Sequence, residues 1–116
     1  KTLTIWGSGR PRREVIFVDD IADACLFFMK KNVKDFLINI GTGKDKSIKD
    51  YANFILKKLN LKAKIKFDKT KPDGVPRKVL DVSLARKYGW KSKISLDDGF
   101  DITYKDFLKN KIYLKK

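Results

Sequence analysis

The sequence predicts an α/β chain in which short strands alternate with amphipathic helices. Apolar runs of strand length occur at residues 3–6 and 36–40. Apolar residues recur at helical spacing from Ile21 and again from Ile48. Turn residues separate these segments, and no internal repeat is visible.

Composition and charge narrow the possible functions. The chain has 116 residues, 42% hydrophobic and 12% aromatic, which is typical of a globular domain. Its net charge of +14 favours a polyanionic partner. However, the lysines are spread between apolar positions, and no RNA-binding aromatic motif, zinc spacing or long basic tract occurs. We therefore interpret the charge as a lysine-rich solvated surface and expect no nucleic-acid partner.

Other features bear on the compartment and on the available chemistry. No apolar run approaches the roughly 20 residues of a membrane-spanning helix, and no signal-peptide pattern opens the chain. The lone Cys25 lies in an apolar helical pattern and forms no disulfide framework. We expect a cytoplasmic protein with no membrane partner and no metal. The absence of histidine removes the commonest general base, and the start at Lys1 inside a strand leads us to expect a piece of a longer protein.

The first predicted strand, residues 3–6, ends at Gly7 and Gly9, which permit positive φ. Pro11 removes a backbone donor, so the chain turns there. The β-rich residues 15–18 predict a second strand.

Arg12 and Arg13 lie where this loop meets the second strand. A planar guanidinium in that place suits a phosphate, which indicates an anion-binding arginine. The alternative is an arginine that pairs with Glu14 or Asp19 and merely holds the loop.

A helix follows from Ile21, with Asp19 or Asp20 as its cap, and ends near residues 30–32. It is apolar on most sides, so we expect it to be buried on more than one. Residues 36–40 are almost continuously apolar, as in a parallel strand covered on both faces. The Gly-Thr-Gly sequence after them is interpreted as a plain turn.

Ser47 and Asp50 form a predicted capping box for the next helix, which Asn60 ends. Residues 63–67 alternate apolar residues with lysine, as in a half-exposed strand. Residues 68–78 form a basic loop with a strong Pro-Asp-Gly turn signal.

Two helices complete the predicted order. Ser83 begins a short one that ends at Tyr88, with Gly89 in the left-handed position. Ser95 opens the last helix, and no role is assigned to the residues beyond Asn110.

Motifs along nearly the whole chain resemble one family. They read, in order, W-G-S-G-x-P-x-R-E, V-D-D, N-I-G-T-G, S-I-K-D, K-P-D-G-V-P-R-K, V-L-D-V-S, Y-G-W and I-S-L-D-D-G. In this order and spacing they resemble the C-terminal part of the GDP-L-fucose synthases, which are extended short-chain dehydrogenase/reductases.

The resemblance implies that residues 1–116 are the substrate-binding portion, with residues 36–40 as one strand of the Rossmann sheet. The N-terminal Rossmann domain, absent here, would bind NADP(H) and carry the glycine fingerprint and the catalytic Ser-Tyr-Lys set. No catalytic residue is therefore expected in this chain, and alone it should show bare apolar surface. The complete enzyme, expected to be a homodimer, would epimerise GDP-4-keto-6-deoxy-D-mannose at C3 and C5 and reduce C4 with NADPH, giving GDP-L-fucose.

The resemblance also assigns substrate-binding residues. Trp6 would stack on the nucleotide, Arg13 would hold the diphosphate, and Asp73 would accept hydrogen bonds from the ribose or the base. Lys71 and Arg77 are weaker candidates for the same pocket.

One position departs from the family pattern. Phe17 replaces a histidine often found before V-D-D, which removes the polar group at that position and leaves the identity of the sugar open. This departure keeps an enzyme acting on another GDP-sugar as one alternative. A basic nucleic-acid-binding module, supported only by the net charge, and an inert scaffold or interaction domain are the others.

Overall fold

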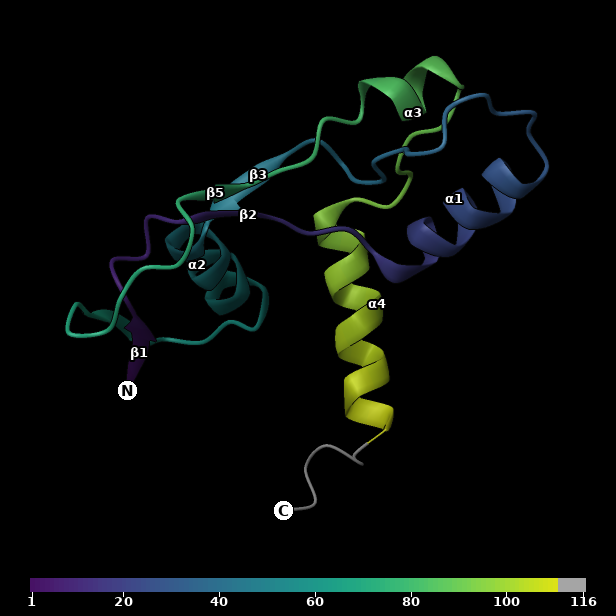
Figure 1. Ribbon diagram of the computed structural model, residues 1–116. Helices are drawn as coiled ribbons and strands as arrows, with labels where there is room; N and C mark the ends of the chain where they lie inside the picture. Colours follow the sequence, from purple (N-terminus) through teal and green to yellow (C-terminus); the bar gives the residue numbers. More distant parts are fainter. Residues whose placement is uncertain (111–116) are drawn as a thin grey trace. The chain divides into compact units, whose positions relative to one another are not determined.

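A computed structural model describes residues 1–110 of the chain (Figure 1). Its strands and helices alternate, which confirms the predicted α/β class. In chain order they are β1 (Thr2–Trp6), β2 (Arg12–Glu14), α1 (Val18–Met29), β3 (Asp45–Ser47), α2 (Ile48–Lys58), β4 (Lys64–Asp68), β5 (Arg77–Lys78), α3 (Ser83–Lys87) and α4 (Leu96–Lys109). The tail, for which the sequence predicted no role, lies outside the described residues.

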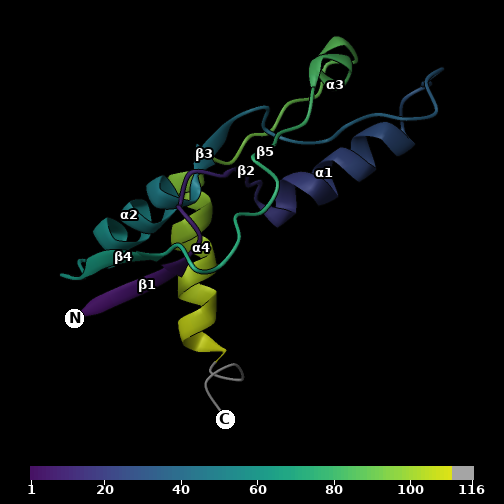
Figure 2. The same ribbon diagram turned by 60° about the vertical axis from the view of Figure 1, so that its left-hand side comes forward.

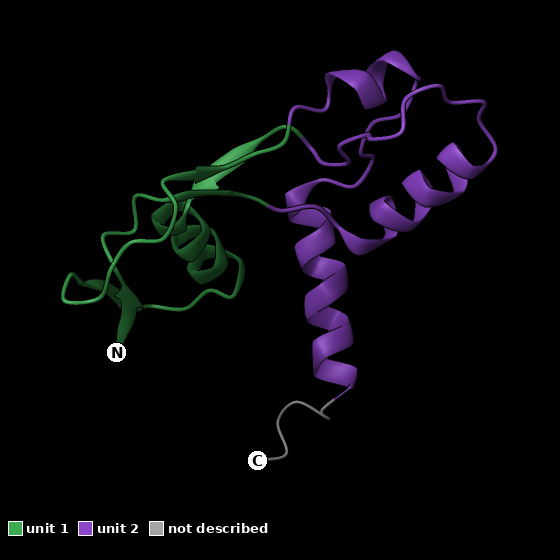
Figure 3. Cartoon of the chain, in the orientation of Figure 1, with its two compact units in different colours: residues 1–14, 43–80 green, residues 15–42, 81–116 purple. Residues whose placement is uncertain are grey.

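The chain divides into two compact units, each built from separate stretches of sequence (Figure 3). Unit 1 comprises residues 1–14 and 43–80, and unit 2 comprises residues 15–42 and those from 81 onward. The described strands and α2 lie in unit 1, whereas α1, α3 and α4 lie in unit 2.

Unit 1 contains a parallel pair of strands that brings two loops together. β1 pairs with β4 in a register that runs from Thr2 opposite Lys64 to Trp6 opposite Asp68, and Figure 2 shows the two strands side by side. The strand predicted at residues 63–67 is thereby confirmed. Because the strands are parallel, the loop after Trp6 and the loop after Asp68 leave from the same edge.

The second sheet of unit 1 has the order β3–β2–β5. Its central strand is Arg12–Glu14, so the prediction of a strand at residues 15–18 is wrong. The backbone N–H of Arg12 donates to the carbonyl of Pro76 at 2.8 Å, which ties this segment to a distant part of the chain. The β-branched run enters unit 2, where Ile16 packs against the core. Tertiary pairing here overrides local strand propensity.

Helix α1 of unit 2 begins at Val18, earlier than the predicted Ile21. Phe17 is the N-cap residue and makes no side-chain cap bond, so the predicted cap by Asp19 or Asp20 is wrong. Asp20 is buried, and its carboxylate accepts hydrogen bonds from the backbone N–H groups of Lys93 and Ile94 at 3.0–3.1 Å. It therefore anchors the segment that leads into α4.

Replacing Asp20 by asparagine should lower the free energy of unfolding of the full-length protein by about 1 kcal/mol, the usual net value of one hydrogen bond. The amide retains one oxygen acceptor but turns an NH₂ group toward the two backbone donors. Urea denaturation followed by circular dichroism measures the loss. The same change at exposed Asp19 is the control, and equal losses at the two positions would contradict this anchoring role.

The hydrophobic core of unit 2 joins α1, α3 and the segment after α3. Ala24, Ala85 and Trp90 are at most 2% exposed. Partly buried side chains pack against these three, namely Ile16, Phe27, Phe28, Ile38 and Ile40. The indole Nε1 of Trp90 donates to Asp23 at 2.9 Å, so its polar atom is satisfied inside the core.

Unit 2 also exposes apolar side chains, as expected for this chain alone. In α1, Leu26 is 58% and Met29 81% exposed, so the helix is not buried on more than one side as first predicted. Residues 36–40 pair with none of the described strands, and Leu37 is 70% exposed. A strand requires a neighbour for its backbone hydrogen bonds, and none of the strands described within residues 1–110 supplies one. Pairing of this segment with a Rossmann sheet stays a prediction.

Local end signals predicted the other elements well. Ser47 and Asp50 form the capping box of α2, and Asn60 follows the helix with a φ of 49°. The side chain of Ser95 caps α4 by accepting from the N–H of Asp98. Gly89 has a φ of 97° one residue beyond Tyr88, the C-cap of α3, as its left-handed assignment requires.

Candidate functional site

The site lies in unit 1, where the two predicted basic loops bind each other. The backbone N–H and the hydroxyl of Ser8 donate to the two carboxylate oxygens of Asp73 at 2.7 and 2.6 Å. These bonds lower the pKa of Asp73 below its usual value. Gly7, with a φ of 81°, lies so close that a Cβ would overlap this carboxylate. Asp73 thus joins the W-G-S-G turn to the K-P-D-G turn.

Trp6 lies at the edge of this junction as an open aromatic surface. It ends β1, and its side chain is 73% exposed. The ammonium nitrogen of Lys71 lies 5.5 Å from the indole centroid, within range of a cation–π interaction. The two predicted binding residues are therefore neighbours, with an aromatic face available for a planar or sugar ring.

Main-chain carbonyls hold Arg13 in place. Its Nη1 donates to the carbonyl oxygens of Arg12 and Val75, each at 2.7 Å. Glu14 instead accepts from the N–H groups of Gly43 and Leu80, so it is not the brace that the alternative interpretation required. Within residues 1–110 no carboxylate forms an ion pair with Arg13, and its charge stays available.

The neighbouring Arg12 has a different partner. Its Nε and Nη2 donate to Asp45 at 3.2 and 3.0 Å, and the Nε of Arg77 donates to the other oxygen of the same carboxylate. The side chain of Asp45 is only 5% exposed. Arg77, a predicted substrate-binding candidate, is therefore held by a buried carboxylate that links β2, β3 and β5.

The ion pairs of Asp45 with Arg12 and Arg77 lead us to expect a loss of folding stability at acid pH. The hydrogen bonds from Arg77 and then Arg12 lower the pKa of Asp45 from 3.8 to about 2. Because the pKa of Asp45 is lower in the folded state than in the unfolded state, the ionised carboxylate stabilises the fold at any pH above the unfolded-state pKa. This contribution is lost as the pH falls from about 4 to about 2. Urea midpoints of the full-length protein should fall less over this window for Asp45→Asn than for the wild type. Equal slopes would contradict the prediction.

The structure thus brings Trp6, Lys71 and Asp73 together and places Arg13 and Arg77 on the second sheet of the same unit. Two residues of this site, Ser8 and Asp45, were not predicted from the sequence. Ser8 stands between the two glycines of the first turn, where a short hydroxyl side chain is a recognisable signal. Asp45 follows the Gly-Thr-Gly turn, and its role depends on partners that no local pattern identifies.

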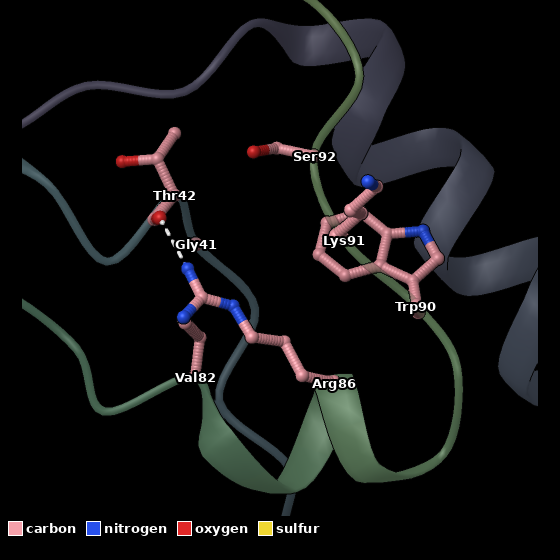
Figure 4. Close-up of a pocket in the computed structure, with 7 residues that line it drawn as sticks. All are labelled: Gly41, Thr42, Val82, Arg86, Trp90, Lys91 and Ser92. Carbon is pink, nitrogen blue, oxygen red and sulfur yellow. Dashed lines mark hydrogen bonds between the residues drawn. The ribbon is translucent and has the colours of Figure 1, made fainter.

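A small cavity in unit 2 is a different feature from this site. It is lined by Gly41, Thr42, Val82, Arg86, Trp90, Lys91 and Ser92 (Figure 4). Arg86 donates from Nη2 to the carbonyl of Thr42 at 3.3 Å. The cavity has a volume of about 10 Å³, which is room for about one water molecule. It is therefore too small for a nucleotide.

Phe17, the departure from the family pattern, has a packing role in unit 2. A Cβ added to Gly99 of α4 would lie 3.2 Å from Cδ2 of Phe17, which shows how closely the ring and this helix approach. The ring therefore supports α4 where a histidine would place a polar group. Among residues 1–110, no helix is long and apolar enough to cross a membrane, and no group of three or more potential metal ligands occurs.

Comparison with known proteins finds relatives that agree with the resemblance predicted from the sequence motifs. The family model described as NAD dependent epimerase/dehydratase matches residues 1–41. The chain is 42% identical over 114 residues to a putative GDP-L-fucose synthase 2 of Arabidopsis thaliana, covering 98% of this chain and 35% of that protein. It is also 42% identical over 117 residues to the GDP-L-fucose synthase of Escherichia coli, covering 93% and 36%.

Solved structures agree. The chain superimposes on a GDP-mannoheptose C4 reductase from Campylobacter jejuni with NADP bound, with a TM-score of 0.81 and 35% identity, covering 95% of this chain and 35% of that one. The chain spans about a third of the length of the curated relatives it matches, over their C-terminal part. These matches confirm the predicted resemblance and the predicted fold class.

Proposed function

We propose that this chain belongs to the NAD-dependent epimerase/dehydratase family and binds the GDP-sugar substrate of an epimerase/reductase. The support is its match to that family model over residues 1–41 and its similarity to the C-terminal third of GDP-L-fucose synthases. The observation that carries the proposal is the joining of the two loops by Ser8 and Asp73. In the same unit lie the exposed indole of Trp6 and Arg13, an arginine that forms no ion pair with any carboxylate among residues 1–110. Those two groups suit a base or ribose and a diphosphate.

We infer that Asp73 contributes mainly by positioning. Both of its oxygens accept from Ser8, so a ribose hydroxyl would share an acceptor that is already engaged. A carboxylate has about four lone-pair sites, which leaves capacity for such an additional donor. Its predicted role as a ligand and its observed role as a link between the loops are therefore compatible.

For the full-length protein we propose an NADP-dependent conversion of GDP-4-keto-6-deoxy-D-mannose to GDP-L-fucose, as the similarity to GDP-L-fucose synthases suggests. Binding of NADP(H) and catalysis are assigned to an N-terminal domain outside this chain, and the full-length enzyme is expected to form a homodimer. The similarity to a GDP-mannoheptose reductase keeps a related reaction on another GDP-sugar as a second candidate. Turnover assays with both keto-sugar substrates distinguish the two.

Calorimetric titration of the full-length protein tests the proposed ligand class. GDP should bind more tightly than ADP, with an affinity that depends only moderately on salt. A nucleic-acid-binding module, which the charge of +14 alone would favour, should instead bind single-stranded DNA with an affinity that falls steeply with salt. Tight DNA binding without any preference for GDP would refute the proposal.

A further inference from the structure

The two faces of the β3–β2–β5 sheet differ in charge. Residues opposite each other on neighbouring strands point to the same face. In this register Arg13 lies opposite Lys46 of β3 and opposite Lys78 of β5. One face therefore carries a row of three cations across its three strands, which we call the cationic row (Lys46, Arg13 and Lys78).

The other face is balanced. Arg12 lies opposite Arg77, and Glu14 lies opposite Asp45. Asp45 pairs with both arginines, so the two positive and two negative groups compensate one another. Among residues 1–110 no ion pair gives the cationic row such compensation, although it lies on the same strands.

Nothing in residues 1–110 neutralises the cationic row by an ion pair. Lys46 and Lys78 are exposed, and Nη1 of Arg13 donates hydrogen bonds to main-chain carbonyls only. Asp50 lies within electrostatic range of Lys46, but its carboxylate accepts from the N–H and hydroxyl of Ser47. Like charges directly opposite each other on a sheet are destabilising, which an anion across the row would relieve.

We propose that Lys46 and Lys78 bind the diphosphate of the nucleotide sugar together with Arg13, one cation from each strand. This inference rests on the proposed function and adds two residues to its site. Neighbouring strands lie about 4.8 Å apart, and each lysine stem has four carbons, so both ammonium groups can reach toward the central guanidinium. A ligand with two linked phosphates matches such a row better than a single phosphate does.

The test compares Lys46→Gln, Lys78→Gln and the double variant in the full-length protein. Lys62→Gln removes the same charge from an exposed position of unit 1 outside the row and is the matched control. Calorimetric titrations use GDP and GMP. Each single variant should weaken GDP binding about fivefold, as expected for an exposed charge contact, and the double variant about 25-fold. GMP binding should change by less, and Lys46→Arg should retain the affinity for GDP.

The outcomes separate this inference from the proposed function. No GDP binding by the wild type would refute the proposed function itself. Wild-type binding that depends on Arg13 but not on Lys46 or Lys78 would overturn only the cationic row. A loss with Lys62→Gln equal to that of the row variants would also overturn it, because the effect would then come from overall charge.

Discussion

Replacing Trp90 by alanine is expected to lower the free energy of unfolding by about 3–5 kcal/mol, the range for deleting a buried aromatic side chain. The indole is 2% exposed between Ala24 and Ala85, so its removal leaves a cavity in the core of unit 2. The substitution also removes the hydrogen-bond donor of Asp23. Urea denaturation of the full-length protein, followed by far-ultraviolet circular dichroism, measures this loss.

The chain offers a matched control for Trp90. Trp6 is 73% exposed, and Trp6→Ala should change stability by less than about 0.5 kcal/mol, as for most surface substitutions. The same Trp6 variant should weaken GDP binding, whereas Trp90→Phe should recover part of the lost stability. Similar losses for the two alanine variants would show that Trp90 is not the centre of the core.

The second large effect is expected at Arg13. Arg13→Ala should weaken binding of the GDP-sugar by about 1.5–3 kcal/mol, the range for hydrogen bonds to charged groups. The reason is geometric, because bonds from Nη1 to two carbonyls hold the guanidinium, and Gly74 lies beside Nη2. Affinity for NADPH should stay unchanged, since the cofactor is assigned to another domain. Titration with GDP and with NADPH measures both.

Arg12→Ala is the control for Arg13. It removes the same charge from the opposite face of the sheet, where the side chain binds Asp45. We expect it to lower thermal stability and to affect GDP affinity much less. Equal losses of GDP affinity, or a matching loss of NADPH affinity for Arg13→Ala, would contradict the assignment. A lower melting temperature with unchanged GDP affinity for Arg13→Ala would indicate that this arginine only braces its loop.

Features that depend only on residues close by in the sequence could be predicted from the sequence. The Ser47 capping box, the left-handed Gly89 and the turn at Gly7 each involve groups within a few residues, so their residue types identify them directly. The α/β class followed from hydrophobic periodicity in the same way. Trp6 and Asp73 were found through motif resemblance, and β1 and β4 then showed why their loops meet.

Tertiary structure decided the features that join distant residues. β2 formed at Arg12–Glu14 because its partners lie on β3 and β5, and no local pattern contains that information. Asp20 became an anchor for the backbone of Lys93 and Ile94 rather than a helix cap. Asp45 and the cationic row likewise depend on cross-strand register. A strand pairs through backbone groups that every residue carries, so its register is set by the partner strand and by packing, which are known only once the chain has folded.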